Sequence, residues 1–163
     1  MREADCAIRL TTPKQPDLIQ RRLTRVKAHV YASPEYIKQN GMPDRIIDLH
    51  NHKLIIFSDD SIQPAPNLNW LLNTTRQSTG SDPKKLLTLN NLYGMFRAVE
   101  AGIGIAGLPD FYARESASMV RVLPELEGPG YDAFFVYPEE LKGSSRIKVF
   151  RDFLVRKVAE TRF

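Results

Sequence analysis

The apolar pattern is most informative between Leu86 and Ala113, where the spacing of apolar residues changes twice. A short apolar run, Leu86 to Leu89, comes first, and a second run, Ile103 to Leu108, ends at Pro109. Between the runs, apolar residues recur three and four positions apart, as on one face of a helix: Leu92, Met95, Phe96 and Val99. Gly102 lies where such a helix would end. The pattern predicts a strand, a helix and a second strand parallel to the first.

The rest of the chain shows short segments with the two-residue period of strands and short segments with the 3.6-residue period of helices. Strict alternation from Thr24 to Ala32 predicts one long, half-buried strand, with Arg25, Lys27, His29 and Tyr31 on its outer face. Further strands are expected over residues 4–10, 54–57, 68–72, 120–123 and 133–137, and helices over residues 34–39, 44–50 and 145–160. The run at 133–137 is apolar on both faces, which suits a central strand. Strands interleaved with helices predict an α/β fold.

Two helices carry further local signals. Ser33 is the expected cap of the helix at residues 34–39, which Asn40 and Gly41 end. The last helix bears one broad apolar stripe, with most of its charged residues off that stripe. Its members are Ile147, Phe150, Phe153, Leu154 and Val158.

Composition and charge exclude several classes of protein. The 163 residues carry a net charge of +4, but the basic residues are scattered and show no helix-turn-helix or zinc-finger pattern, so direct binding of this chain to DNA is not expected. No apolar run reaches the length of a membrane span, and no signal peptide is present, so no membrane partner is expected. The single cysteine, Cys6, is expected to pack as a small hydrophobe, which suits a cytoplasmic protein.

The residues that could carry catalysis are few. The three histidines, His29, His50 and His52, lack partners at metal-ligand spacing and are expected to be solvated or capping residues. Carboxylate pairs occur only in turn-like segments, and no nucleophile elbow or phosphate-binding glycine loop is present. The glycines of AGIGIAG precede and lie within a strand, so they fail the structural test for a dinucleotide site. We expect no enzyme activity, no cofactor and no metal.

A binding site remains. In open α/β sheets, ligands bind outside the carboxyl ends of parallel strands, which here lead to the turns at Asn90-Asn91 and at Pro109-Asp110. Free N–H groups at the helix start make a polar or anionic ligand group plausible there, although Asn91 could equally serve only as the helix cap. Thr11 and Thr12, after the first strand, could face a ligand or only satisfy turn backbone groups.

Four segments in register resemble a known family. The pattern N-N-x-x-x-M-x-R-A-V-x-A-G-I-G-I-A-x-L-P, from Asn90 to Pro109, is similar to the effector-binding domain of LysR-type transcriptional regulators. READCAIRL, VYASPEYIKQNGMP and FVYPEELKGSSRIKVFRDFL resemble three further segments of that domain, in the same order. The resemblance covers essentially the whole chain.

The resemblance implies a two-lobed, periplasmic-binding-protein-like (type 2) α/β module that holds a small effector in a cleft. Residues 31–131 would form the second lobe, and residues 1–30 with 132–163 the first. Carried over by position, the residues that line the cleft are Leu10, Thr11, Thr12, Ser58, Asn90, Asn91, Leu108 and Pro109. The intact regulators of this family bind DNA and form homo-oligomers.

The chain departs from the family pattern at its start. The winged helix-turn-helix that binds DNA is absent, as is the first βαβ unit of the effector domain, so the chain resembles an N-terminally truncated domain with an incomplete first lobe. We therefore expect weak or no effector binding, and self-association through the exposed edge of the first-lobe sheet. The alternative is a free-standing small-molecule binding protein, or a fragment that associates with intact regulators and interferes with them.

Overall fold

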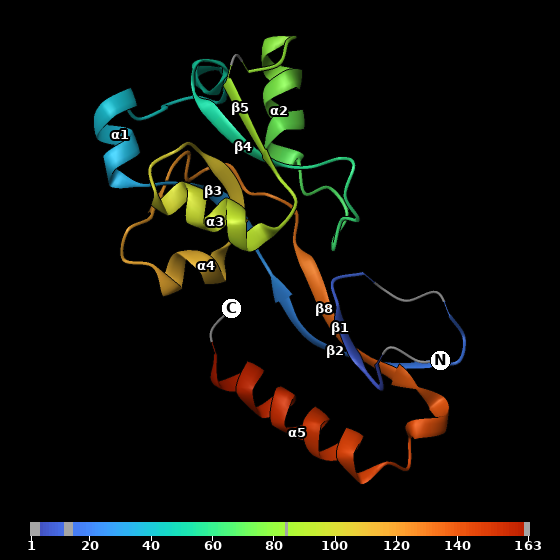
Figure 1. Cartoon of the computed structure of the whole chain (residues 1–163). Coiled ribbons are helices and arrows are strands. Elements are labelled where there is room, and N and C mark those ends of the chain that lie inside the picture. Colours follow the sequence, from blue (N-terminus) through green and yellow to red (C-terminus); the bar gives the residue numbers. More distant parts are fainter. Residues whose placement is uncertain (1–3, 12–14, 84, 162–163) are drawn as a thin grey trace. The chain divides into compact units, whose positions relative to one another are not determined.

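The chain divides into two compact units, which are described separately. The computed structural model describes residues 4–11, 15–83 and 85–161. One unit combines residues 1–26 with 130–163, and the other is the continuous segment 27–129 (Figure 1). Within the described residues, no helix has both the length and the apolar character needed to cross a membrane.

The first unit contains a three-stranded antiparallel sheet. Its order is β1 (Ala7–Arg9), β8 (Tyr131–Pro138) and β2 (Leu18–Val26). The ladder between β2 and β8 runs from Leu18 opposite Pro138 to Val26 opposite Tyr131, with an irregularity between Arg22 and Thr24. The central position predicted for residues 133–137 is confirmed, because β8 is paired on both of its edges.

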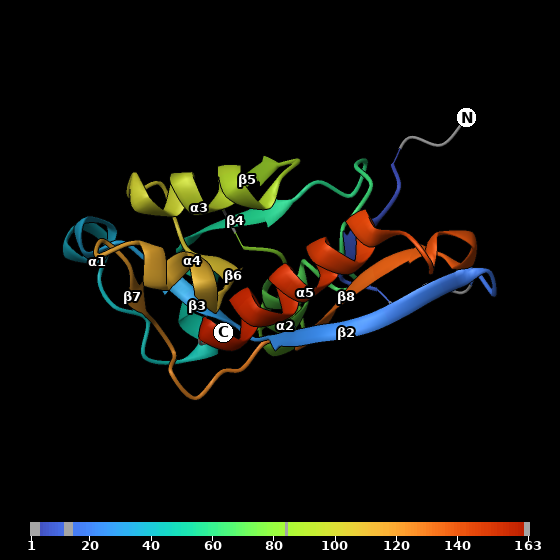
Figure 2. The ribbon, with the colours of Figure 1, turned by 90° about the horizontal axis from the view of Figure 1, so that it is seen from below.

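Helix α5 (Ser145–Glu160) follows a short 3-10 turn, Glu139–Leu141, and covers one face of this sheet (Figure 2). The buried core between helix and sheet consists of Phe135, Tyr137 and Ile147, with Cys6, Ile19, Leu23, Leu141 and Leu154 packed around it. The apolar stripe of α5 is only partly buried. Phe150 and Phe153 are each 42% exposed, because only the Ile147 and Leu154 side of the helix faces the sheet.

The second unit contains a two-stranded parallel sheet and a three-stranded antiparallel sheet, which one isolated bridge connects. Strands β4 (Lys53–Phe57) and β5 (Lys85–Leu89) pair in parallel over five residues each. A single parallel bridge, Leu54 to Ile105, joins β4 to the start of β6 (Ala106–Pro109). Strand β6 then pairs antiparallel with β3 (Ala28–Ala32), and β3 with the two-residue strand β7 (Val120–Arg121). The parallel unit predicted for residues 86–108 is thus present, with β4 between its two strands.

The long strand predicted from Thr24 to Ala32 is wrong in its continuity. Lys27 separates β2 from β3, and the two strands belong to different sheets. The predicted exposed face is also wrong within β3, where His29 and Tyr31 are buried. Alternation predicts a solvated outer face, but helices of the second unit cover that face too, since α4 (Asp110–Glu115) contacts β3.

Five helical segments surround these two sheets: α1 (Pro34–Asn40), a 3-10 helix at Ile46–Asn51, α2 (Trp70–Thr79), α3 (Leu92–Glu100) and α4. The predicted cap of α1 is confirmed, because Ser33 Oγ accepts a hydrogen bond from the Tyr36 N–H at 3.1 Å. The core on the α2 side is formed by eleven buried residues, including Val30, Leu54, Trp70 and Ile105. Met95, Phe96 and Val99 of α3 are buried as well.

The strand predicted at residues 68–72 is instead the beginning of α2, which makes this prediction wrong. Asn69 anchors the segment, since its side-chain oxygen accepts the Phe57 N–H and its amide donates to the Phe57 carbonyl, both at 2.8 Å. The helix then continues through polar residues, in which Thr74 and Thr75 donate to the carbonyls four residues earlier. A short apolar run alone does not distinguish a strand from a buried helical turn.

Candidate functional site

The candidate site begins where three strands of the second unit end at one edge of the sheet. Phe57 of β4 lies opposite Leu89 of β5, so these two parallel strands end together (Figure 1). The parallel bridge between Leu54 and Ile105 gives β6 the same direction. Beyond this bridge β6 pairs with β3 and ends at Leu108 and Pro109. Ligand sites of open α/β sheets lie at such edges.

Ser58 and the two asparagines, which were carried over from the family resemblance, lie near one another at this edge. The Ser58 N–H donates to the Leu89 carbonyl at 2.8 Å, which extends the ladder by one residue and places Ser58 beside Asn90. Asn91 caps α3, because its Oδ1 accepts the Gly94 N–H at 2.5 Å. Its amide donates to Asn90 Oδ1 at 3.0 Å. The cap thus orients the Asn90 side chain as well as the helix.

The start of α3 can hold a polar or negatively charged group. The Asn91 side chain satisfies the Gly94 N–H, and the Asn91 carbonyl accepts the Met95 N–H. The two remaining N–H groups of the first turn, of Leu92 and Tyr93, take no acceptor within the described residues. Unpaired N–H groups and the helix dipole favour anionic or polar acceptors at this end.

Leu108 and Pro109 are buried, whereas Asn90 and Asn91 are exposed. Leu108 is fully buried in β6, and Pro109 is buried at the end of the same strand and precedes α4. Their side chains form part of the wall of the unit, so contact with a ligand would run through main-chain atoms. Among the other predicted residues, Leu10 is half-buried and Thr11 exposed in a bend after β1 of the first unit, and Thr12 lies outside the described residues.

A polar cluster that was not predicted from the sequence surrounds Asp110, the residue that follows Pro109. Asp110 Oδ1 is 2.6 Å from His29 Nδ1 and accepts a hydrogen bond from the Tyr31 hydroxyl at 3.0 Å. Burial, followed by the charge of Asp110, raises the pKa of Tyr31 to about 12. Within the described residues, His29 Nε2 has no hydrogen-bond partner, and its nearest carboxylate oxygen is Glu127 Oε1 at 3.8 Å. The cluster fixes the turn from β6 into α4.

The expectation that the histidines are solvated or capping is wrong for His29 and His52. His29 is 4% exposed and His52 is 8% exposed. The Tyr36 hydroxyl accepts the Lys53 N–H at 3.0 Å and lies 3.2 Å from His52 Nδ1, to which its proton can be donated. Burial lowers the pKa of His52, which keeps the ring neutral and able to accept. This pair connects α1 with the start of β4.

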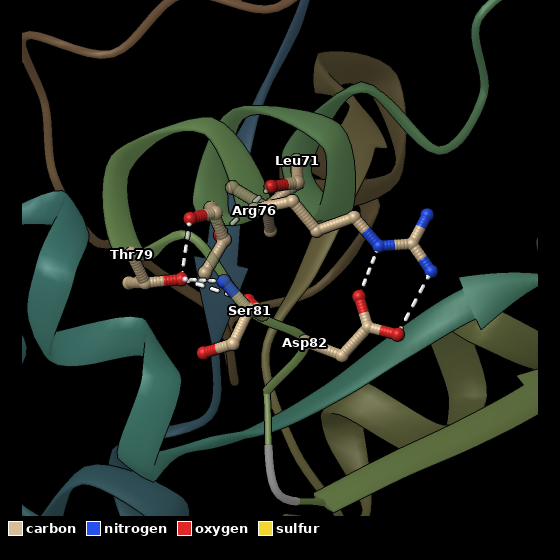
Figure 3. Close-up of polar contacts among 6 residues, drawn as sticks. Leu71, Arg76, Thr79, Ser81 and Asp82 are labelled. Atoms are coloured by element: carbon tan, nitrogen blue, oxygen red, sulfur yellow. Dashed lines mark hydrogen bonds and ion pairs between the residues drawn. The ribbon is translucent and has the colours of Figure 1, made fainter.

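A polar pocket of about 160 Å³ lies next to Ser58, between the loop after β4 and helix α2. Its polar lining consists of Asp59, Gln63, Asn67, Asn69, Asn73 and Arg76. Asn69 donates to Asp59 Oδ1 at 3.0 Å, and Arg76 forms a bidentate ion pair with Asp82, in which Nη2 lies 3.1 Å from Oδ2. Figure 3 shows this ion pair and the Thr79 hydroxyl, which donates to the Ser81 carbonyl where α2 ends. The pocket adds amide and charged groups at the same edge of the unit.

Comparison with known proteins gives one consistent family. The family described as LysR substrate binding domain matches residues 1–159. An HTH-type transcriptional regulator from Xanthomonas campestris is 28% identical over 164 residues, which cover 96% of this chain and 46% of that protein. A regulator of the same type from Haemophilus influenzae is 27% identical over 137 residues, or 82% of this chain and 46% of the relative. The chain spans about half the length of the curated relatives it matches.

Solved structures agree on the fold. The regulatory domain of CrgA, a LysR-type transcriptional regulator from Neisseria meningitidis, superposes with a TM-score of 0.79 at 24% identity. The match covers 96% of this chain and 76% of that domain. The regulatory domain of an AphB variant from Vibrio vulnificus matches with a TM-score of 0.67 at 25% identity, over 94% of this chain and 77% of the other. The relatives are transcriptional regulators.

Proposed function

Because the chain belongs to the LysR substrate-binding domain family, we propose that it is the effector-sensing domain of a LysR-type transcriptional regulator. In this function the chain binds a small polar or anionic molecule and performs no chemistry on it. The intact regulator would bind DNA and work as a homo-oligomer in the cytoplasm. The two compact units, 1–26 with 130–163 and 27–129, would be the two lobes of the module.

The observation that carries the proposal is the convergence of Ser58, Asn90 and the start of α3 at one edge of the second unit. The Ser58 hydroxyl, the Asn90 amide and the free N–H groups of Leu92 and Tyr93 offer hydrogen bonds of the kind that a carboxylate accepts. No described side chain makes a hydrogen bond to the Ser58 hydroxyl, so no general base activates it, which supports binding without catalysis. Leu10, Thr11 and Thr12 remain predicted contributors from the first unit.

A ligand screen tests this function. We would measure the melting temperature of the whole chain against a library of small carboxylates, amino acids and aromatic acids. At least one compound should raise the melting temperature, because a ligand that binds only the folded state stabilises it by mass action. The stabilisation should be concentration-dependent and should saturate.

Matched variants then locate the ligand. Ser58→Ala and Asn90→Ala remove side chains at the proposed site and leave the cap residue Asn91 in place. Asn51→Ala removes an exposed asparagine from the 3-10 helix of the same unit and serves as control. We expect the first two variants to weaken the stabilisation and Asn51→Ala to leave it unchanged. The proposal would be contradicted if a ligand raised the melting temperature of Ser58→Ala and Asn90→Ala as much as that of the unchanged chain. It would also be contradicted if no compound in the library raised the melting temperature.

No observation on the described residues favours the alternative of a free-standing binding protein or an interfering fragment. Effector sensing accounts for the edge described above.

A further inference from the structure

A pocket of about 270 Å³ lies between the 3-10 helix of the second unit and the end of α2. Its lining consists of Ile47, His50, Asn51, Ser78, Thr79 and Ser81. The 3-10 helix leads into the start of β4, whereas Ser58 follows the end of that strand. The pocket and the proposed effector edge therefore belong to opposite ends of β4, and they share no residue.

The frame of this pocket is held by hydrogen bonds at the end of α2. The Gly80 N–H donates to the Arg76 carbonyl at 2.8 Å, and Gly80 adopts the left-handed conformation, with φ at 72°, which turns the chain back after the helix. The Thr79 hydroxyl donates to the Ser81 carbonyl at 2.8 Å and accepts the Ser81 N–H at 3.4 Å (Figure 3). Helix α2 also packs against the 3-10 helix, which brings the two walls of the pocket together.

Four polar side chains of the lining take no hydrogen bond within residues 4–11, 15–83 and 85–161. They are the hydroxyls of Ser78 and Ser81, the amide of Asn51 and the imidazole of His50, whose Nδ1 is buried. Buried polar atoms are usually paired, so the unpaired Nδ1 of His50 is a second sign of an incomplete polar site. Hydroxyl and amide groups both donate and accept, so they suit a ligand that does the same.

The charges around the pocket favour a neutral ligand. None of the described lining residues carries a carboxylate, an ammonium or a guanidinium group. The nearby charged residues are paired with one another, since Arg76 forms an ion pair with Asp82, and Arg45 lies 3.8 Å from Asp48. Both helices end at the pocket, and the carbonyl groups of a helix C-terminus accept hydrogen bonds and carry partial negative charge. An anion is therefore disfavoured, and no carboxylate is present in the lining to hold a cation.

Ile47 supplies an apolar part of the lining. This residue is 46% exposed and lies one turn before His50 in the 3-10 helix. An apolar wall beside donors and acceptors suits a ring that presents C–H groups on one face and hydroxyl groups around its rim. The pocket volume is roughly nine times the 30 Å³ that a water molecule occupies in the liquid, which is room for a single ring.

We propose that this pocket is a second binding site, for a neutral hydroxylated ring of the size of a monosaccharide. The hydroxyls of the ligand pair with Asn51, Ser78 and Ser81, and its C–H face lies against Ile47. Asn51, Ser78 and Ser81 are exposed, so the bound ring keeps part of its hydration, and we expect a dissociation constant on the order of millimolar. The site does not depend on the proposed effector site, because the two have no residue in common.

A titration of the whole chain with D-glucose, D-galactose, D-ribose and myo-inositol tests the proposal. Heteronuclear NMR would follow the backbone amide signals at sugar concentrations up to about 100 mM. At least one of the four compounds should shift the signals of His50, Ser78 and Ser81, and the shifts should saturate. Inorganic phosphate and tetramethylammonium, the charged probes, should bind more weakly than the best of the four.

Matched variants locate the ligand and separate this site from the effector edge. Asn51→Ala and Ser81→Ala each remove an exposed polar group and should weaken the binding of the sugar about twofold to tenfold, the range expected for one lost hydrogen bond. Ser58→Ala, at the effector edge, should leave the dissociation constant of the sugar unchanged. Melting temperatures of all three variants without ligand would show that the fold is kept.

Three results would overturn the proposal. The first is that none of the four compounds shifts the signals of the pocket. The second is that the sugar binds Asn51→Ala and Ser81→Ala as tightly as the unchanged chain. The third is that phosphate or tetramethylammonium binds the pocket more tightly than any of the four compounds. Because Ser58→Ala affects only the effector edge and Asn51→Ala only this pocket, either proposal can fail while the other holds.

Discussion

His29 Nδ1 and Asp110 Oδ1 lie 2.6 Å apart, across the junction between β3 and the start of α4. The carboxylate also accepts the Tyr31 hydroxyl, so one oxygen holds two side chains of the same strand. Asp110 directly follows Leu108 and Pro109, which end β6 at the proposed effector edge. The position of that turn therefore depends on a buried polar contact as well as on apolar packing.

Replacing Asp110 should destabilise the second unit. Asp110→Ala leaves the His29 nitrogen and the Tyr31 hydroxyl without their acceptor, and buried groups that lose a partner cost about 1–3 kcal/mol. Urea unfolding at neutral pH measures the loss. Asp60→Ala, in the exposed loop after β4, is the control and should stay within about 0.5 kcal/mol of the unchanged chain. If the two variants had equal free energies of unfolding, the Asp110 cluster would contribute nothing to the stability of the second unit.

The raised pKa values of two buried tyrosines lead us to expect a loss of stability at high pH. Burial raises the pKa of Tyr31, and of Tyr131 in the other unit, to about 12, from 10.0. The unfolded chain releases these protons near pH 10 and the folded chain near pH 12, so the unfolded state holds fewer protons in that window. The contribution of these two tyrosines to the free energy of unfolding should be fully present below pH 10 and should be lost as the pH rises through 12.

The tyrosine prediction can be checked by urea unfolding at a series of alkaline pH values. Tyr31→Phe should make the decline between pH 10 and 12 shallower, because one of the ionising groups is removed. A spectroscopic titration of phenolate absorbance should show the same residue ionising late. An unchanged slope in Tyr31→Phe would contradict the assignment.

Gly104 allows the close approach of β4 to the segment before β6. A Cβ atom at this position would stand 2.4 Å from the Lys53 carbonyl oxygen, which accepts the Ile105 N–H at 2.9 Å. Gly104→Ala must therefore shift backbone atoms, and we expect a loss of about 1–3 kcal/mol. Gly143→Ala is the matched control, because a Cβ there meets nothing within 4 Å. Thermal unfolding followed by circular dichroism compares the two, and equal stability of both variants would refute the prediction.

The cap at Asn91 should have a measurable effect on the stability of α3. Asn91→Ala removes the acceptor of the Gly94 N–H and should cost about 1 kcal/mol, whereas Asn91→Asp keeps an acceptor and should cost much less. Chemical denaturation gives both values. Asn91→Asp also places a negative charge at the proposed site, so it should lower the affinity for an anionic effector. If Asn91→Ala were as stable as the unchanged chain, the cap would have no energetic importance.

The sequence predicted those parts of the fold that depend on local periodicity and on turn chemistry. The parallel strands around α3, the central strand β8 and the Ser33 cap follow from spacing and local residue type. Ser58 came only from the family resemblance, and the structure brings it beside Asn90 because β4 and β5 end together. The α2 helix was not predicted, because its apolar residues occupy only the first turn. Its later residues, from Asn73 to Thr79, resemble a polar turn and become helical through contacts made elsewhere in the unit.

The Asp110 cluster could not be predicted from one strand. His29 and Tyr31 occupy the polar positions of an alternating segment, and whether those positions meet solvent depends on α4, more than seventy residues later in the chain. The signal that could have revealed the cluster is the excess of large, weakly polar side chains on that face, beside the charged Arg25 and Lys27. Phe150 and Phe153 show the converse case, since periodicity predicts a stripe but not how much of it the sheet covers.

The division of the first unit between the two ends of the chain sets an order of events during synthesis. Strand β2 ends at Val26, and its partner β8 begins at Tyr131, so roughly a hundred residues separate them. At translation rates of about 5–20 residues per second, about 5–20 s pass between the synthesis of β2 and that of β8. The continuous segment 27–129 can fold during that interval. On the ribosome, the unit that carries the asparagine edge therefore forms first, and the unit that carries α5 closes only after β8 and α5 have emerged.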